Sequence, residues 1–250
     1  LRPGVYLSFL VKPLMLIANT LNISKWVNEQ KDKSIMNDFF TWKRDHNRRY
    51  NLYEDISKKM ELSNLEVDYI ELGVYKGQSF KWWLNNNKNP NSKFYGFDTF
   101  EGLPEAWGLN FKKGSMNAVG IPDITDERAT FIKGLFQDTL PTFLKENNLD
   151  NGKRKIIHFD ADLFSSTLFG LCTLSPFFKE GDIILFDEFN VPLHEFKAFL
   201  EFTKNYYVGG IGSVRGYAPG SLGPQYYNTV IGAYQPTGGQ SKIVTNVEYT

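Results

Sequence analysis

Short apolar runs alternate with amphipathic segments from residue 66 to about residue 206. Five of the runs are almost continuously apolar, as strands buried on both faces of a sheet are, and they predict strands at 67–72, 93–98, 130–136, 155–160 and 182–187. The amphipathic segments between them predict helices near 78–87, 139–148, 165–178 and 192–206. This alternation indicates an α/β fold with a mostly parallel sheet and helices on both of its faces.

The two ends of the chain differ from this central pattern. Residues 1–65 are helix-like, and we expect them to form an N-terminal helical extension to a domain that spans residues 66–250. Near the C-terminus, "YYVGGIGSVRGY" and "YNTVIGAYQ" predict two further strands joined by a Gly/Pro-rich loop. The sheet would then have about seven strands, with the last pair as an antiparallel edge.

The N-terminal run "VYLSFLVKPLMLIANTL" is apolar but does not predict a transmembrane segment. Lys12 and Pro13 interrupt it, and it is shorter than the ~20 residues that span a bilayer. We interpret it as a helix that covers the core or a neighbouring subunit, and in the second case the chain would form a homo-oligomer through its N-terminal helices. An anchor on a membrane surface is the less favoured interpretation.

Charge and cysteine content narrow the choice of partners. The 28 basic and 28 acidic residues balance, which disfavours nucleic acid as a partner. Cys172 is the single cysteine and lies in an apolar stretch, so an intramolecular disulfide is excluded. A reducing compartment suits this composition, and we expect a cytoplasmic protein.

Polar residues collect where the predicted strands end. Ligands of open parallel sheets bind beyond the carboxyl ends of the strands, so these positions are the candidates for a site. They are Glu71, Gly73, Asp98, Asp138, Asp160, Asp162, Asp187 and Glu188.

The first turn, "ELGVYKGQS", places Gly73 and Gly77 where a ligand could approach the backbone closely. It lacks the G-x-G-x-x-G pattern that wraps a pyrophosphate, which disfavours a nicotinamide oxidoreductase. Glu71, ahead of the glycines, suits a cationic ligand such as an ammonium or a sulfonium group. Asp98 could accept hydrogen bonds from ribose hydroxyls.

The turn "GLFQDTLP" places Gln137 and Asp138 after the third strand. They could bind an adenine amino group, and Asp138 or Thr139 could instead cap the helix that follows.

The endings "HFDADLF" and "DIILFDEF" bring acidic residues to two adjacent strands. Buried carboxylates repel one another unless a cation lies between them, and Mg²⁺ prefers such oxygen ligands. Asp160, Asp187 and Glu188 form the simplest set of ligands. Asp162 could be a base, a group that supports the ligands, or a helix cap.

The three histidines do not have the spacing of metal ligands. They are His46, His158 and His194. Of the three, only His194 is expected near the site.

The segments "YIELGVYKGQS", "FYGFDTFEGLPE", "GLFQDTLP" and "HFDADLFSSTLFGLCTLSPFFKEGDIILFDEF" resemble, in order and spacing, the macrocin O-methyltransferase family over about residues 66–190. The resemblance implies the Rossmann-like class I fold of S-adenosylmethionine (SAM)-dependent methyltransferases. Members of this family use SAM and Mg²⁺ to methylate sugar hydroxyls on macrolides and aminocoumarins. The spacing of Asp160 and the 187/188 pair also resembles, more distantly, that of catechol-type O-methyltransferases.

The resemblance also implies roles for individual residues. Glu71, Gly73 and Gly77 would surround the methionine part of the cofactor, Asp98 would bind the ribose, and Gln137 and Asp138 would lie near the adenine. Asp160, Asp187 and Glu188 would bind the metal, with Asp160 or Asp162 as the catalytic base. The neighbouring residues counted as cofactor-binding are Tyr75, Ser79, Thr99 and Phe100.

The resulting prediction is a SAM-dependent, Mg²⁺-assisted O-methyltransferase that acts on a hydroxyl of a sugar or a glycosylated small molecule. The chain has Asp187-Glu188-Phe189 where the family usually has Asp-Asp-Tyr, so the third metal ligand would be longer by one methylene. Substrate choice is expected to depend on residues 104–126 and on the C-terminal tail. The alternatives are a non-catalytic binding protein on a methyltransferase scaffold and, less favoured, a nucleotide-cofactor oxidoreductase.

Overall fold

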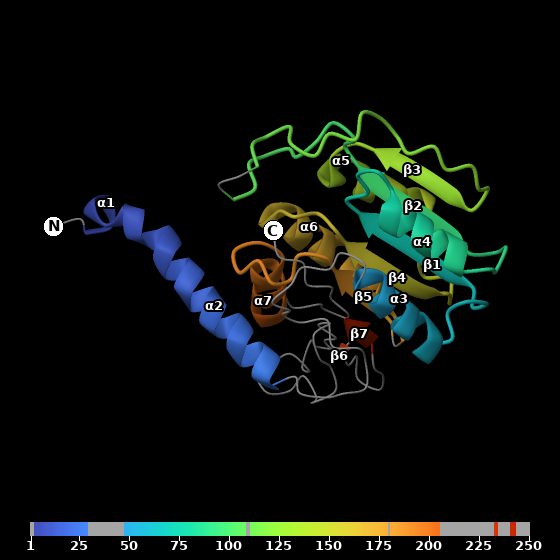
Figure 1. Cartoon of the computed structure of the whole chain (residues 1–250), viewed down its shortest axis with the longest axis horizontal. Helices are drawn as coiled ribbons and strands as arrows, with labels where there is room; N and C mark the ends of the chain where they lie inside the picture. The colour runs from blue at the N-terminus through green and yellow to red at the C-terminus, as the bar shows by residue number, and fades with distance from the viewer. Residues whose placement is uncertain are drawn as a thin grey trace.

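The computed structural model describes residues 3–29, 48–108, 111–179, 181–205, 233–234 and 241–243. Its centre is a parallel sheet with the strand order β3-β2-β1-β4-β5 (Figure 1). The strands are β1 (Val67–Leu72), β2 (Lys93–Asp98), β3 (Ala129–Lys133), β4 (Arg154–Phe159) and β5 (Ile183–Phe186). The five strands predicted for the central pattern are confirmed, and with them the mostly parallel α/β fold.

Two short strands extend this order beyond β5. β7 (Ser241–Ile243) pairs with β5 in parallel, and β6 (Ala233–Tyr234) pairs with β7 in antiparallel orientation. β6 falls within the predicted strand "YNTVIGAYQ", and β7 follows it. The other strand expected near the C-terminus, "YYVGGIGSVRGY", lies outside the described residues, as does His46.

The helices that connect the strands are close to those predicted. They are α4 (Gln78–Asn86), α5 (Phe136–Glu146), α6 (Phe164–Leu174), which continues into η2 (Ser175–Phe177), and α7 (Glu195–Asn205). The expected capping by Asp138 or Asp162 is wrong. Leu135 and Leu163 hold the N-cap positions of α5 and α6, and neither helix has a side-chain cap. The two acidic side chains are therefore not explained by helix capping.

The N-terminal part contains α1 (Pro3–Tyr6), η1 (Ser8–Leu10), α2 (Val11–Glu29) and α3 (Arg48–Lys59). The C-terminal half of α2 packs on the body of the protein through Trp26, whose ring centroid lies 5.4 Å from that of Phe189. The other end of α2 reaches away from the sheet (Figure 1). Among the described residues no helix is both long enough and apolar enough to cross a membrane.

Side chains alternate between the two faces of the sheet, as the pleat requires. Tyr69 of β1 belongs to a core cluster with α3 and α4, whereas its neighbour Ile70 belongs to a second cluster with α5, α6 and α7. Residues 156, 183 and 185 lie on the α3/α4 face, and residues 157, 159, 184 and 186 lie on the opposite face. The sheet is thus covered on both sides, and each strand end presents alternate residues to different helices.

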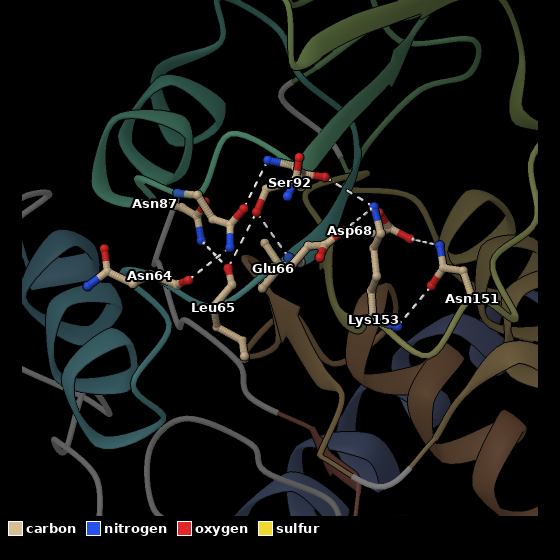
Figure 2. A network of polar contacts seen from close by, with 11 residues as sticks. Asn64, Leu65, Glu66, Asp68, Asn87, Ser92, Asn151 and Lys153 are labelled. Atoms are coloured by element: carbon tan, nitrogen blue, oxygen red, sulfur yellow. Dashed lines mark hydrogen bonds and ion pairs between the residues drawn. The ribbon is translucent and has the colours of Figure 1, made fainter.

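A polar network joins the amino ends of the strands, at the edge of the sheet opposite the strand-end acids (Figure 2). The Ser92 hydroxyl accepts a hydrogen bond of 3.0 Å from the backbone amide of Val67. Asn151 donates a hydrogen bond of 2.6 Å to Asp68, and Lys153 lies 3.8 Å from the same carboxylate. These contacts hold the starts of β1, β2 and β4 together. The acidic residues discussed below lie at the other ends of these strands.

Candidate active site

A cavity of about 880 Å³ lies at the carboxyl edge of the sheet. The predicted site residues that line it come from the ends of four strands and from the first turn of α5. They are Gly73, Tyr75, Asp98, Thr99, Gln137, Asp160, Asp162, Asp187 and Glu188. Five other predicted residues are not part of this wall: Glu71, Gly77, Ser79, Phe100 and Asp138.

Asp98 connects the turns that follow β1 and β2. Its Oδ2 accepts hydrogen bonds from the backbone amides of Val74, at 2.8 Å, and Tyr75, at 2.7 Å. Its Oδ1 accepts a hydrogen bond of 2.7 Å from the amide of Phe100. A carboxylate offers about four acceptor positions. Asp98 therefore shapes the wall of the cavity first and keeps about one position for a ligand hydroxyl.

The two glycines of the first turn have different surroundings. Gly73 has φ +94°, and a Cβ there would lie 1.8 Å from the carbonyl oxygen of Asp160. The β1 turn therefore touches the backbone at the end of β4. Gly77 has φ +72° and faces Pro122, 3.2 Å from the position of a Cβ, so it contacts the loop before β3 and not the cavity.

A buried polar chain lies beneath the cavity, on the α3/α4 face of the sheet. The Tyr69 hydroxyl donates a hydrogen bond of 2.6 Å to Glu71 and lies 3.1 Å from Nδ1 of His158. The Tyr53 hydroxyl lies 3.4 Å from Nε2 of His158. The Tyr69 hydroxyl donates its proton to the hydrogen bond with Glu71, so Nδ1–H of His158 donates to the Tyr69 oxygen. Nε2 of His158 then accepts a hydrogen bond from the Tyr53 hydroxyl.

Burial keeps this chain uncharged. It lowers the pKa of His158 to about 3 and raises the pKa of Glu71 well above its usual value. Glu71 thus lies below the cavity, bonded to Tyr69, and is not one of the residues that line the cavity.

Asp160 and Asp187 meet at the ends of β4 and β5. They and His158 each offer one ligand atom, and the three atoms lie within 4.8 Å of one another. Burial raises the pKa of Asp160 well above its usual value, and the Asp187 carboxylate adds to this effect. A cation between the two carboxylates would relieve the repulsion, and their oxygens are the ligands that Mg²⁺ prefers.

The expectation that only His194 of the histidines would lie near the site is wrong, because His158 lies directly beside Asp160 and Asp187. Both its ring nitrogens already contact tyrosine hydroxyls, so Asp160 and Asp187 are the better candidates of the three for binding a metal. Glu188 lines the cavity but is not one of the three residues whose ligand atoms converge in the described part of the chain.

Arg49, in the first turn of α3, was missed by the sequence analysis. Its Nη1 lies 3.4 Å from Oδ1 of Asp187, and it lines the cavity. Asp187 has the same parity as Ile183 and Leu185, which lie on the α3/α4 face. This alternation predicts that Asp187 faces α3, but nothing in the charged N-terminal sequence distinguishes Arg49 from Arg48.

Glu195 also escaped the sequence analysis. It is fully buried at the start of α7, and its Oε2 accepts a hydrogen bond of 2.8 Å from the backbone amide of Glu188. Burial raises its pKa well above the usual value, and the carboxylates of Asp187 and Asp162 add to the effect. Glu195 thus holds the turn that carries Asp187 and Glu188.

Asp162 has a left-handed backbone, with φ +58°. Such a conformation is uncommon outside glycine and, in a buried turn, is often associated with function. The side chain is buried and lines the cavity, close to the end of β4.

The loop after β2 forms a further wall of the cavity. The rings of Trp107 and Phe111 stack with centroids 4.9 Å apart, and both residues line the cavity. Trp107 packs in a small apolar cluster with Leu163, which follows β4, and Val191, which follows β5. The segment 104–126, expected to influence substrate choice, therefore reaches the acidic strand ends.

Gln137 and Asp138 are adjacent in sequence but face different spaces. Gln137 lines the main cavity, whereas Asp138 lines a separate groove of about 450 Å³ with Thr139 and Thr142. The structure therefore does not bring the two proposed adenine partners together.

A curated relative is similar to part of the chain. The chain is 26% identical over 145 residues to 8-demethyl-8-(2,3-dimethoxy-alpha-L-rhamnosyl)-tetracenomycin-C 4'-O-methyltransferase of Streptomyces olivaceus, across 50% of this chain and 53% of that protein. The chain thus spans about half the length of the curated relative that it matches.

Solved structures are also similar to the chain, among them those of two O-methyltransferases. The apo structure of CalS11, a TDP-rhamnose 3'-O-methyltransferase of calicheamicin biosynthesis, has a TM-score of 0.45 and 21% identity over 74% of this chain and 83% of its own. The O-methyltransferase NovP has a TM-score of 0.34 and 22% identity over 49% of this chain and 58% of its own.

Two family matches overlap on the chain. Residues 157–250 match an Omp85 superfamily domain. However, residues 157–189 of this segment contain the end of β4, helix α6 and strand β5, and both strands belong to the parallel sheet. A methyltransferase domain matches residues 70–189, which run from β1 past β5 and contain both acidic strand ends. The matched segment thus contains all five central strands except the first residues of β1, and the acidic strand ends that line the cavity, so the methyltransferase domain is what this part of the chain is similar to.

Proposed function

We propose that the protein is a SAM-dependent, Mg²⁺-assisted O-methyltransferase that acts on a hydroxyl of a sugar or a glycosylated small molecule. One observation carries the proposal. Asp160, Asp162 and Asp187 line the same cavity as the Gly73 turn and Asp98. The carboxylates proposed to bind the metal and the residues proposed to bind the nucleoside therefore face one cavity. The matched relative, whose name describes a methyltransferase of a rhamnosyl group, supports a sugar as the acceptor.

The cavity suits a nucleoside cofactor together with an acceptor. Its volume of about 880 Å³ is within the roughly 300–1,000 Å³ typical of small-molecule sites. We assign the cofactor to the Gly73–Tyr75 turn, to the remaining acceptor position of Asp98, and to Gln137 at the adenine end. Glu71, Ser79 and Phe100 would act from beneath, by holding these turns in place. The methyltransferase domain would span residues 66–250.

Bound SAM supplies an electrophilic methyl group, and a bound divalent cation polarises the acceptor hydroxyl and lowers its pKa. Asp160 and Asp187 would hold the cation, with Glu188 as a third ligand. Asp162, or the free oxygen of Asp160, accepts the proton that the hydroxyl loses. Trp107 and Phe111 exclude water from this end of the cavity and position the acceptor.

Ligand-dependent thermal stability tests the proposal. S-adenosylhomocysteine (SAH) at 100 times its dissociation constant should stabilise the protein by about 2.7 kcal/mol. Stabilisation by NADH in place of SAH would overturn the proposal in favour of an oxidoreductase. Binding of SAH and Mg²⁺ without transfer of a labelled methyl group to any of a panel of rhamnosides would favour the non-catalytic alternative.

We also propose self-association through the N-terminal helices. Leu14, Ile17 and Leu21 of α2 are exposed and recur at spacings of three and four residues. Leu10 of η1 and Leu7 just before it are also exposed and continue these spacings toward the N-terminus. This is the spacing of an apolar seam between paired helices, so a second copy of α2 is the partner that fits it. The cytoplasmic location stays a prediction. Cys172 is half-buried and is not part of a disulfide.

A further inference from the structure

Arg49 links the N-terminal helices to the acidic strand ends. Its guanidinium lies 3.4 Å from the Asp187 carboxylate, and the two side chains are 16% and 5% exposed. Burial raises the pKa of Asp160 and of Glu71, and the charge of Arg49 opposes this rise at both carboxyl groups, so it acts on more than its partner Asp187.

The Asp187 carboxylate is therefore within reach of two different cations. In the proposed function it binds a divalent cation together with Asp160, whereas in the structure it pairs with Arg49. A guanidinium and a divalent cation on one buried carboxylate repel each other strongly. The distance of 3.4 Å exceeds the roughly 2.7–2.9 Å of a tight charge-assisted hydrogen bond, so the ion pair is a loose one.

We propose that Arg49 is an exchangeable counter-ion of Asp187, which neutralises this carboxylate while no divalent cation is bound and leaves it when the cation binds. The inference rests on the metal site of the proposed function. It adds that the first turn of α3 responds to metal loading. The ion pair of Arg49 with Asp187 is present in the metal-free protein and is lost in the loaded one, while the buried Tyr53 and Ile56 keep α3 in place. Arg49 is then also free to turn toward the cavity.

Calorimetric titration of the full chain with Mg²⁺ at pH 8 tests this exchange without any methyl transfer. Removing a competing cation should tighten metal binding, so Arg49→Met should bind Mg²⁺ about tenfold more tightly, within the range typical of coupled equilibria. Arg49→Lys keeps the competing charge and should bind Mg²⁺ much as the unmodified protein does.

Lys59→Met is the matched control. It removes one positive charge from the same helix, where Lys59 pairs with Asp55 at 2.8 Å on the surface, and it should leave Mg²⁺ binding unchanged. Equal or weaker binding by Arg49→Met overturns the exchange while the metal site stands. An absence of binding by the unmodified protein overturns both the exchange and the metal part of the proposed function.

A second measurement does not depend on how well Arg49→Met folds. The Nε–H signal of Arg49 in a ¹⁵N spectrum, assigned from its loss in Arg49→Lys, should shift when Mg²⁺ saturates the unmodified protein, and its exchange with water should become faster. A signal that stays constant through saturation overturns the proposal.

Discussion

The carbonyl oxygen of Asp160 occupies the space that a side chain on Gly73 would need. A Cβ at Gly73 would lie 1.8 Å from this oxygen, and the glycine has φ +94°. The turn proposed to hold the cofactor and the turn that carries the acidic residues therefore touch through their backbones. A change in one turn is transmitted to the other without any intervening side chain.

Gly73→Ala should consequently be among the most damaging single changes in the chain. The methyl group would overlap the Asp160 carbonyl in a left-handed conformation, and we expect a loss of more than about 3 kcal/mol in the free energy of unfolding. Urea denaturation measures it. Gly152→Ala is the control, because Gly152 also has positive φ, at +80°, but no atom within 4 Å of the added methyl. Its cost should be about 1–2 kcal/mol, and equal losses for the two variants would contradict the clash.

Asp160→Ala should separate chemistry from cofactor binding. We expect methyl transfer to fall by about 10²-fold or more, because a proposed metal ligand and base is lost. SAH binding, measured by calorimetry, should persist. Asp98→Ala should lose SAH binding, and methyl transfer with it, because it removes the acceptor of three backbone hydrogen bonds that shape the cofactor turn. Loss of SAH binding in Asp160→Ala would argue against this division of roles.

His158 should make the metal-free protein less stable in acid. The pKa of His158 is about 3 in the folded protein against 6.5 in the unfolded chain, so the unfolded chain takes up this proton first. The contribution of the neutral His158 side chain to the free energy of unfolding is fully present above pH 6.5 and is lost as the pH falls toward 3. At pH 4.5 the loss should be about 2.7 kcal/mol.

The measurement is the free energy of unfolding by urea at pH 7 and pH 4.5, in the presence of a chelator. His158→Gln is compared with the unmodified protein, since the buried acids titrate in both and cancel in the difference. An equal fall in stability for both proteins would show that His158 does not carry the effect.

Leu14→Glu should disrupt self-association. Leu14 lies at the centre of the exposed seam on α2, where a buried carboxylate would be costly. Sedimentation velocity should report a smaller species than for the unmodified protein, with an unchanged circular dichroism spectrum. Lys12→Glu is the control, because Lys12 lies outside the seam and the change should leave the assembly intact. A monomeric unmodified protein would rule out the seam as an interface.

The sequence predicted the sheet well because its strands are apolar on both faces. Runs such as 182–187 are typical of strands that are buried on both faces of a parallel sheet. Asp98, Asp160 and Asp187 mark the ends of three of these strands. Helix starts were less accurate. The start of α5 was placed at a polar residue, but Leu135 holds the cap position and the helix begins earlier.

The site was predicted in part, for a physical reason. Acids at strand ends are brought together by the parallel sheet itself, so Asp160 and Asp187 could be paired from sequence alone. Arg49 and Trp107 reach the cavity from a helix and from a loop, and no periodicity connects either residue to a strand end. His158 could have been placed near Asp160 by its parity along β4, but its tyrosine partners depend on packing across three elements.

The position of α3 determines where the chain can be truncated. Tyr53 and Ile56 of this helix are fully buried in the core cluster on one face of the sheet, and Arg49 supplies charge to the strand ends. A chain shortened to begin at β1 would keep every motif of the methyltransferase match. The same deletion would remove the buried side chains of α3 from the core cluster and the positive charge of Arg49 from the acidic strand ends.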